Sequence, residues 1–592
     1  MLNKTLTVSH MPHISLFFVG LMWVLPFLHY RHNYPLTTFY QEWWSALLGV
    51  LALILLTARD FWQQPEIPRI AQFPAALLAI VLLQWALGMA IYFDQVLLYT
   101  LYLLFAALLM LLGARLRDCF GMDRLALTLA VFLLVGAELS ALIGVLQHYR
   151  WQTPLNAVVV AKLSPIVFGN LAQPNHFANY IALGMASLGL LFQQNRLKAR
   201  YVVLLAVPLL LVMTLSGSRS SWLYLLLMCG LAGWWARRDA AQKPLLHYSL
   251  LLLAGFGVMH LVVQLPFMAG AGGSINTVQR LFGESASGSI RLYLWREAWL
   301  IFMQSPLLGV GFGQFAWHHF ELVPVLQQNG VTGLYNNAHN LVFQLAAEAG
   351  VAGLLALLAS FAVWLYGLRR TTPDAARWWG FTILGVLAIH SLLEYPLWYT
   401  YFVAIAAILL GVLDETRYRL ELRNIGRLSM MSILLLGLLT LVQLYGGYQQ
   451  MEQVLRIPAA SAADQGTPDR TRDSLIEVHG KSLLSPYAEL IMSSLIVVND
   501  NHLKEKLELN TRVMRFVPVA LVTYRQALLL AQAGDQEQAA RVMGQAIWSY
   551  PESFAGARKQ LEALAEKNPA RFSALLEFAL RKEQEYRRAV HQ

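Results

Sequence analysis

The feature that most constrains this chain is a series of long apolar runs separated by short polar connections. A helix needs roughly 20 residues to cross about 30 Å of hydrocarbon, and apolar runs near this length recur between residues 14 and 447. The chain is therefore expected to be an all-α, polytopic membrane protein with about thirteen transmembrane helices. The predicted spans are 14–30, 44–58, 73–92, 96–114, 125–147, 177–193, 201–215, 221–236, 248–268, 340–365, 379–393, 397–413 and 429–447.

The composition excludes several other classes of protein. Of the 592 residues, 57% are hydrophobic and 13% are charged, whereas a soluble domain carries about 25% charged residues. The net charge of +10 does not indicate nucleic-acid binding, because the basic residues stand singly between apolar blocks. Cys119 and Cys229 lie in or beside apolar runs, which excludes a disulfide scaffold and a cysteine-rich metal site.

The distribution of Lys and Arg predicts the orientation of the chain. These residues concentrate in alternate short connections, such as 115–124, 194–200 and 414–428, and cytoplasmic loops carry the excess of positive charge. The first span lacks a small-residue cleavage site, so we interpret it as an anchor rather than a signal peptide. With the N-terminus in the cytoplasm, thirteen crossings place residues 448–592 on the opposite side.

Residues 448–592 differ in character from the rest of the chain. Apolar residues recur there at spacings of three and four, Gly534 marks a helix end, and Pro551 opens the next unit. This pattern predicts helical hairpins of the tetratricopeptide-like (TPR-like) kind. Two interpretations remain open, namely a domain that packs on the membrane part and a docking surface for a protein or peptide.

The residues that could carry chemistry lie in the outer connections. The segments 31–43, 148–176, 216–220 and 269–338 are rich in Asn, Gln, His, Arg, Trp and Tyr. Connections longer than about 12–15 residues are uncommon unless they serve a function. Because ATP is not available outside a bacterial inner membrane, a transfer reaction there needs an already activated, lipid-linked donor.

Four segments carry a resemblance to a known family. Residues 337–353 read NAHNLVFQLAAEAGVAG, residues 306–313 read PLLGVGFG, residues 390–399 read HSLLEYPLWY, and residues 173–176 read QPNH. The first two resemble the "HN…L…E.G..G" signature and the preceding glycine-rich turn of the O-antigen ligase and polymerase superfamily. The other two, with the helical tail, resemble the bacterial protein O-oligosaccharyltransferases, the pilin glycosylation ligases of the PglL type.

The resemblance covers most of the chain and implies a multihelical, GT-C-like glycosyltransferase that works without a metal or other cofactor. The implied reaction moves a preassembled oligosaccharide from undecaprenyl diphosphate to Ser or Thr of an exported acceptor protein such as type IV pilin. The implied location is the bacterial inner membrane, in contact with its lipid, with the active site and residues 448–592 facing the periplasm. No nucleic-acid partner is expected.

Two further functional classes compete with this one. The first is another activity of the same superfamily, either ligation of O-antigen to lipid A-core or polymerisation of O-antigen. The second is a transporter, for which internal repeats and ionisable residues near the membrane midplane would be expected. Neither feature is clear in the sequence, apart from Glu138 inside the fifth predicted span. The tail and the LEYPLWY segment favour a protein acceptor.

The chain is accordingly divided into three parts. Residues 1–160 form an N-terminal transmembrane region. Residues 161–447 form an O-antigen ligase-like transmembrane catalytic region that includes the periplasmic loop 269–338. Residues 448–592 form the periplasmic, TPR-like helical domain.

Arginine side chains are the predicted ligands of the donor diphosphate. The charge that develops on this leaving group must be stabilised by a metal or by fixed guanidinium donors, and the loops hold no acidic cluster typical of a metal site. Arg219 lies in a short turn between two spans, and Arg291 begins an amphipathic stretch. A planar guanidinium can donate two parallel hydrogen bonds to phosphate. Arg280 and Arg296 are further substrate-binding candidates, and the alternative for all four is a snorkelling interfacial arginine.

His339 is the predicted catalytic residue at the entry of the tenth span. A neutral imidazole can accept the proton of an attacking hydroxyl near neutral pH, although a role as an orienting hydrogen-bond donor stays open. Asn340, beside it, is a candidate for substrate binding. Asn337 stands where some relatives have a second histidine, which counts against a mechanism with two histidines.

Two further groups of polar residues are candidates at helix ends. Glu394 and Tyr395 lie in a tight outer turn before Pro396, where they could position the acceptor hydroxyl or the glycan; alternatively, Glu394 simply pairs with a loop arginine. Three polar residues lie at the entry of the sixth span, and their amides and imidazole suit sugar hydroxyls or phosphate oxygens. A structural role is an equal alternative for them. These residues are Gln173, Asn175 and His176.

Overall fold

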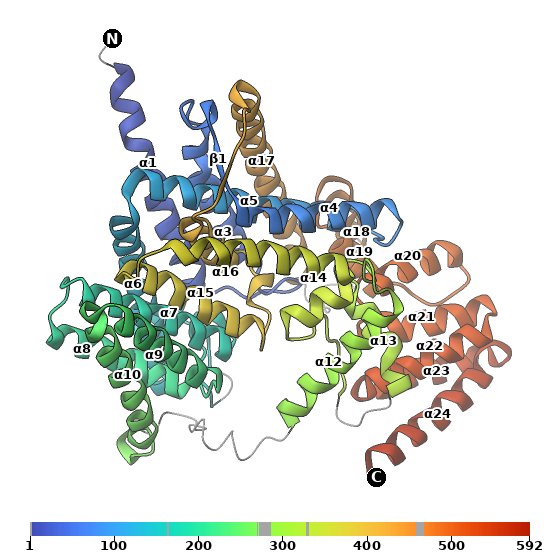
Figure 1. The fold of residues 1–592 in the computed structure, drawn as a ribbon. Helices are drawn as coiled ribbons and strands as arrows, with labels where there is room; N and C mark the ends of the chain where they lie inside the picture. The colour runs from blue at the N-terminus through green and yellow to red at the C-terminus, as the bar shows by residue number, and fades with distance from the viewer. Residues whose placement is uncertain are drawn as a thin grey trace. The chain divides into compact units, whose positions relative to one another are not determined.

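The chain is built almost entirely of helices in the computed structural model (Figure 1). The structure describes residues 3–162, 165–268, 270, 286–326, 331–456 and 467–591. Within these ranges the strands are β1 (Glu66–Pro68) and β2 (Arg417–Arg419), which pair antiparallel with Ile67 opposite Tyr418. The prediction of an all-α protein is therefore confirmed.

Eight helical segments of the described residues are long and apolar enough to cross a membrane. They are His10–Leu28, Phe39–Thr57, Arg69–Ala86, Phe93–Phe120, Met122–Tyr149, Ala240–Val262, Leu341–Gly367 and Arg423–Arg456. Two shorter apolar helices are α8 (Ala199–Leu215) and α16 (Thr400–Leu413). The chain is a multi-pass membrane protein, whereas the count of thirteen spans stays a prediction.

The other labelled α-helices of the membrane part, several of which form the segments above, match the predicted apolar runs in position. They are α1 (Asn3–Met22), α2 (Leu25–Leu28), α3 (Phe39–Ala52), α4 (Gln72–Ala86), α5 (Phe93–Phe120), α6 (Met122–Tyr149), α7 (Pro174–Gln193), α9 (Ser220–Arg238), α10 (Lys243–Val262), α14 (Leu341–Gly367), α15 (Ala375–Ser391) and α17 (Arg423–Arg456). Among the described residues between α10 and α14, the α-helices are α12 (Ala286–Gln304) and α13 (Phe315–Leu326).

The chain divides into two compact units, and each combines segments that are distant in sequence. The first unit is Met1–Ala76, Tyr102–Gly288 and Ala356–Val442. The second unit is Leu77–Leu101, Ser289–Leu355 and Gln443–Gln592. The predicted domain boundaries at residues 160 and 447 stay predictions.

Helix α7 lies at the centre of the first unit. It is buried along almost its whole length and packs against α6, α8, α9 and α15. A helix that is apolar on all sides is expected in such a buried position. The ring of Tyr180 on α7 stacks on Phe27 with centroids 3.9 Å apart, and its hydroxyl donates to the Trp23 carbonyl oxygen (2.8 Å). These contacts fix the N-terminal end of α7, where three candidate site residues lie.

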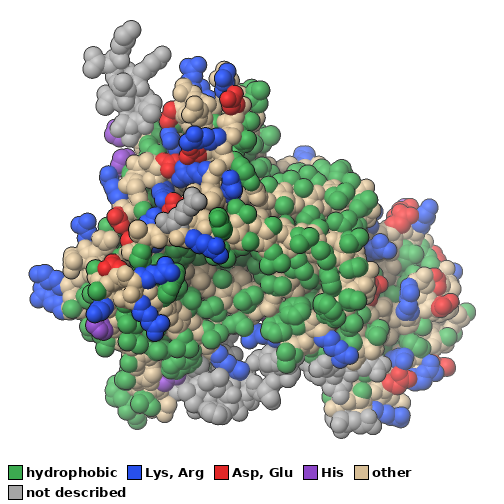
Figure 2. All heavy atoms as spheres, viewed as in Figure 1, with side chains coloured by type: hydrophobic (Ala, Val, Ile, Leu, Met, Phe, Trp, Pro, Cys, Tyr) green, Lys and Arg blue, Asp and Glu red, His purple; other side chains and the backbone are tan. Residues whose placement is uncertain are grey.

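The surface of the first unit is apolar where helices face outward. Leu251 on α10 and Ile425 on α17 are about three-quarters exposed, at 73% and 75%, and exposed leucines and valines follow along both helices. Figure 2 shows hydrophobic side chains covering much of the surface in view. Such apolar surface is expected to face lipid, because contiguous patches of this kind are rare on soluble proteins.

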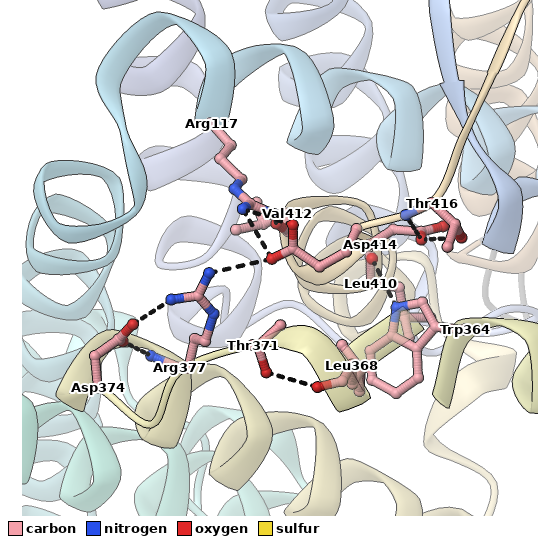
Figure 3. A network of polar contacts seen from close by, with 11 residues as sticks. Arg117, Trp364, Leu368, Thr371, Asp374, Arg377, Leu410, Val412, Asp414 and Thr416 are labelled. Atoms are coloured by element: carbon pink, nitrogen blue, oxygen red, sulfur yellow. Dashed lines mark hydrogen bonds and ion pairs between the residues drawn. The ribbon is translucent and has the colours of Figure 1, made fainter. Parts of the chain in front are cut away.

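A network of charged residues joins the ends of three helices in the first unit (Figure 3). Arg117, near the end of α5, donates to the Val412 carbonyl oxygen (2.9 Å) and to both oxygens of Glu415 (2.9 and 3.1 Å). Arg377, at the start of α15, donates to Glu415 (3.1 Å) and to Asp374. Burial alone would raise the pKa of Glu415, but the two guanidinium groups hold it below its usual value. This network links α5, α15 and the end of α16.

In the second unit, helix α14 is broken at Gly350, and the glycine-rich loop 306–313 pairs with the break. Gly350 has non-helical angles of φ 62° and ψ −158°. Backbone groups freed inside a membrane helix need partners, and this loop provides them. The four bonds are Val351 N–H to Pro306 O (2.8 Å), Ala352 N–H to Leu307 O (3.1 Å), Val310 N–H to Ala347 O (3.0 Å) and Gly311 N–H to Glu348 O (3.3 Å).

Gly309 is expected to tolerate no side chain, because the loop lies directly against α14. Its φ is +71°, and a Cβ atom would lie 2.2 Å from the Glu348 carbonyl carbon. Gly309→Ala combines left-handed strain with overpacking, so we expect a loss of about 3 kcal/mol or more in the free energy of unfolding. The measurement is thermal unfolding of the purified protein in detergent.

Gly88 provides the matched control in the same unit. It also has a positive φ, of +75°, but nothing lies within 4 Å of its Cβ position. Gly88→Ala is therefore expected to cost only about 1 kcal/mol of backbone strain. Equal shifts of the melting temperature for the two variants would contradict the close packing of the loop on α14.

The C-terminal part of the second unit is a succession of helices. Gly534, with φ +91°, ends one helix, and the Asp535 side chain caps the next by accepting from the Gln538 N–H (3.1 Å). The helical hairpin predicted around Gly534 is thus present, whereas its TPR-like classification stays a prediction. The helices are α18 (Thr467–Lys481), α19 (Ser485–Ser494), α20 (Leu503–Phe516), α21 (Ala520–Ala533), α22 (Gln536–Ser549), α23 (Phe554–Lys567) and α24 (Pro569–His591).

Candidate active site

The N-terminal end of α7 holds three of the predicted substrate-binding residues, namely Gln173, Asn175 and His176. The side-chain oxygen of Gln173 accepts from the backbone N–H of His176 (2.5 Å), and Pro174 occupies the first helical position. Proline at this position is favoured because its φ is already helical and it lacks an N–H that would be unsatisfied. Asn175 and His176 therefore project from a fixed first turn, as the sequence predicted for a helix start.

His176 belongs to a buried chain of three polar side chains. Its Nδ1 lies 3.1 Å from His390 Nε2, and His390 Nδ1 lies 2.9 Å from the Tyr224 hydroxyl. Less than 3% of each of these three side chains is exposed. Two imidazoles in hydrogen-bond contact need one donor and one acceptor nitrogen between them, so the chain can hold or pass a proton. His390 and Tyr224 were not predicted as site residues.

Asn175 bonds directly to Glu394 in the turn between α15 and α16. Asn175 Nδ2 donates to Glu394 Oε1 at 2.7 Å, and Glu394 is only 4% exposed. The Glu394 backbone N–H donates to the His390 carbonyl oxygen (2.7 Å), which fixes the turn. Burial raises the pKa of the neighbouring Tyr395, and the Glu394 charge raises it further. The turn therefore holds a neutral phenol beside the carboxyl group of Glu394.

Exchanging the two partners tests this hydrogen bond. Asn175→Asp places a second carboxylate at hydrogen-bond distance from Glu394, so we expect about tenfold slower transfer at pH 8. The loss should shrink towards pH 6, because one of the paired carboxyl groups then takes up a proton. In Asn175→Asp/Glu394→Gln the amide again donates to a carboxylate, and transfer should return to within about threefold of wild type.

The outcome that would contradict this role is a double variant as slow as the Asn175→Asp single variant. The comparison uses initial rates of glycan transfer measured at both pH values, with the melting temperature recorded for every variant. A restored melting temperature without a restored rate would show that Glu394 needs its own carboxylate in the reaction.

Arg219 lies at a different helix start in the first unit. It is the N-cap residue of α9, it is half-buried, and the preceding turn depends on Gly217, which has a φ of +61°. The N-terminus of a helix carries partial positive charge and attracts anions. A guanidinium at this place adds a full charge, so the position suits a phosphate ligand. The pairing of Arg219 with Arg291 on one diphosphate stays a prediction.

Arg291 and Arg296 lie on α12 in the second unit. Arg291 is half-buried and Arg296 is exposed. Trp295, between them, stacks on Phe343 with centroids 5.4 Å apart and rings 18° from parallel. Phe343 is in the first turn of α14, so this contact links α12 to the helix that follows His339. Arg280 lies outside the described residues.

His339 occupies a left-handed position immediately before α14. Its φ is +50°, which is uncommon for a residue other than glycine, and its backbone N–H donates to Asn337 Oδ1 (3.0 Å). Asn340 caps α14 by accepting from Val342 N–H (2.9 Å) and Phe343 N–H (3.2 Å). The sequence motif therefore corresponds to a helix cap that sets the direction of the His339 side chain.

Apart from Arg219 and Arg280, the candidate residues fall into two groups. In the first unit, Gln173, Asn175, His176, Glu394 and Tyr395 lie together, joined by the contacts described above. In the second unit, His339 and Asn340 form the cap of α14 beside the helix that carries Arg291. The described residues contain no cluster of three His, Cys, Asp or Glu side chains able to hold a metal ion.

Three family models match successive parts of the chain. The model described as "O-Antigen ligase" matches residues 204–358. The model described as "Virulence factor membrane-bound polymerase, C-terminal" matches residues 378–563. The model described as "Protein glycosylation ligase" matches residues 167–192, which include the start of α7.

Two curated relatives come from Acinetobacter baylyi (strain ATCC 33305 / BD413 / ADP1). A "General O-oligosaccharyltransferase" is 27% identical over 73% of this chain and 74% of its own length. A "ComP-specific O-oligosaccharyltransferase" is 25% identical over 68% of this chain and 70% of its own length. The matched ligase models and the similarity to these two relatives support an O-oligosaccharyltransferase of the O-antigen ligase superfamily.

Proposed function

We propose that this protein transfers a preassembled oligosaccharide en bloc from undecaprenyl diphosphate to a Ser or Thr hydroxyl of an exported protein such as type IV pilin. The coarser function, O-linked protein glycosylation by a glycosyltransferase, rests on the two relatives, both of which are named O-oligosaccharyltransferases. That similarity over about two-thirds or more of each chain is the observation that carries the proposal.

The proposed chemistry assigns a role to each candidate at the reacting centre. The acceptor oxygen attacks the anomeric carbon while its proton passes to the His339 imidazole. The bond between the anomeric carbon and the phosphate oxygen breaks, and undecaprenyl diphosphate leaves with its charge stabilised by Arg219 and Arg291. The Asn175–Glu394 pair and Tyr395 position the acceptor or the glycan.

The remaining candidates are proposed as ligands of the donor sugar or diphosphate. They are Gln173, His176, Arg280, Arg296 and Asn340. Gln173 and Asn340 each cap a helix, which supports a fixed position for the neighbouring side chains.

The proposed site of action is the periplasmic face of the inner membrane. A contact within the second unit supports this sidedness: the Tyr92 hydroxyl donates to Glu489 Oε2 (2.6 Å). Tyr92 precedes α5 in a turn that the charge pattern places outside the cytoplasm, and Glu489 lies on α19 of the C-terminal part. Burial alone would raise the pKa of Glu489, but hydrogen bonds from Arg512 and Tyr92 hold it below its usual value.

We expect transfer to be independent of divalent cations. In the proposed mechanism guanidinium groups, rather than a Lewis-acid metal, stabilise the leaving diphosphate. EDTA should therefore change the initial rate by less than about twofold relative to a matched buffer. A strict requirement for Mg²⁺ or Mn²⁺, with activity restored on adding it back, would contradict the arginine mechanism.

The acceptor class is tested by competition in vitro. The purified protein is given an undecaprenyl diphosphate glycan together with pilin and lipid A-core, and both products are measured by mass spectrometry. We expect pilin to gain the mass of the whole glycan at a serine or threonine. Product on lipid A-core alone would identify an O-antigen ligase, and an extended glycan that remains on the polyprenyl carrier would identify a polymerase.

A further inference from the structure

A buried pair of ionisable side chains in hydrogen-bond contact lies between α12 and α13 in the second unit. His319 Nδ1 is 2.8 Å from Glu297 Oε2, and the two side chains are 1% and 0% exposed. Neither residue belongs to the motifs that carry the family resemblance. A buried carboxylate is costly unless a charged or hydrogen-bonded partner compensates it, so this pair needs a reason to be present.

The other nitrogen of the same ring contacts the segment that leads to His339. His319 Nε2 lies 3.3 Å from the Gly333 carbonyl oxygen. Because a carbonyl oxygen only accepts hydrogen bonds, Nε2 must carry the proton in this contact. The Gly333 N–H in turn donates to the Ser549 carbonyl oxygen at the end of α22 (2.8 Å). Gly333 is therefore fixed from both sides.

The pair connects α12, which carries Arg291, to the segment 331–340, which carries His339. The predicted reaction depends on both of these residues. Glu297 is six residues after Arg291 on α12, and Gly333 is six residues before His339. Tyr335, on the same segment, packs edge-on against the His319 ring with centroids 5.4 Å apart. His319 thus contacts both α12 and the segment 331–340.

We propose that His319 and Glu297 are positioning residues for glycan transfer, which hold the Arg291 helix and the His339 segment at a fixed separation. This inference rests on the proposed function for its kinetic consequence, while its structural consequence can be measured independently. His319 carries the contact to Gly333, and Glu297 holds the imidazole in the orientation that makes this contact.

Packing alone is the competing explanation for the position of the segment 331–340. Residues of α12 and of this segment share a small apolar cluster that includes Tyr293, Leu294, Val331 and Ala338, and Trp295 stacks on Phe343. If this packing were sufficient, an apolar pair of similar volume would replace His319 and Glu297 without loss. Apolar replacements of buried ion pairs are often neutral or stabilising, so stability and positioning can be separated.

The test compares His319→Leu with the double variant Glu297→Met/His319→Leu in the full-length protein. The single variant leaves a buried carboxylate without its imidazole, so its melting temperature should fall. The double variant should regain the melting temperature but not the contact to Gly333. We expect kcat to be at least about tenfold lower in both variants, with KM for the lipid-linked donor within about twofold of wild type.

Hydrogen exchange gives the readout that does not depend on activity. Amides of the segment 331–340 should exchange at least about tenfold faster in the double variant, while exchange in α21 and α22 stays as in wild type. His318→Leu is the matched control, because His318 is adjacent but contacts Glu321 (3.4 Å) instead; it should leave the rate and exchange unchanged.

The outcomes separate this inference from the proposed function. Wild-type exchange in the segment 331–340 of the double variant, or recovery of kcat together with the melting temperature, would overturn the positioning role. Failure of the wild-type protein to transfer glycan to any acceptor would contradict the proposed function instead, and the exchange measurement would still decide whether the pair holds the segment.

Discussion

Replacing His339 by alanine is expected to lower the rate of glycan transfer by about 10²–10⁴-fold, the range that a positioned general base contributes. The protein should remain inserted and folded, because Asn340 still caps α14 through its bonds to Val342 and Phe343. The measurement is the initial rate of transfer from undecaprenyl diphosphate glycan to the acceptor protein, with the melting temperature recorded alongside.

The backbone of His339 requires a second variant. At φ +50° histidine is tolerated better than alanine, so a loss of activity in His339→Ala has two explanations, namely loss of the imidazole and backbone strain. Asparagine tolerates this conformation but supplies no base. His339→Asn should therefore be as inactive as His339→Ala if the imidazole matters, whereas recovery in His339→Asn would assign the loss to backbone strain.

Arg291→Lys is expected to lower the transfer rate by about 10²-fold although it keeps the positive charge. A lysine ammonium cannot reproduce the two parallel hydrogen bonds that a guanidinium makes to a phosphate, and loss of one such donor costs about this much in other enzymes. The effect should appear in kcat, because charge develops on the diphosphate as the glycosidic bond breaks.

The control for this substitution is an arginine on an exposed helix surface. Arg558 on α23 pairs with Glu562 one turn away at 2.8 Å, and such surface pairs contribute little. Arg558→Lys should leave the rate within about twofold of wild type. A near-native rate for Arg291→Lys would show that charge attraction alone suffices at position 291.

Local features of the site could be predicted from the sequence because they depend on neighbouring residues. The turn before α7 is set by Gln173 and Pro174, and the cap of α14 is set by Asn340. A polar residue at the boundary of an apolar run is a signal that a single sequence contains. The same reasoning located the short turn that carries Arg219.

The polar contacts inside the bundle could not be predicted in this way. Tyr224 and His390 are 166 residues apart in sequence, and each lies in a largely apolar helix without a periodic signal that marks its partner. The contact between Tyr92 and Glu489 spans 397 residues. Such pairs depend on which helices become neighbours, and apolar patterning alone does not specify the order of helices in a bundle.

The pairing of the glycine-rich loop with α14 could be predicted from the sequence only in part. The spacing of Gly309, Gly311 and Gly313 predicted a turn, and all three have positive φ. The break in α14 at Gly350 was not predicted, because the sequence shows Gly350 only as part of a family signature. The backbone groups on both sides of the break make the matching hydrogen bonds to the loop. Its role follows from the requirement that backbone groups in a membrane be satisfied.

In the proposed mechanism, the His339 segment and the C-terminal helices act on the periplasmic side of the membrane. Both native cysteines are free, so they can be replaced by alanine before single cysteines are introduced at the exposed positions Asn336 and Val590, with Arg238 as the cytoplasmic control. Intact cells are then treated with a membrane-impermeant maleimide. We expect Asn336→Cys and Val590→Cys to be labelled, and Arg238→Cys to be labelled only after the membrane is permeabilised. Labelling of Arg238→Cys in intact cells, with Asn336→Cys or Val590→Cys protected, would contradict the account.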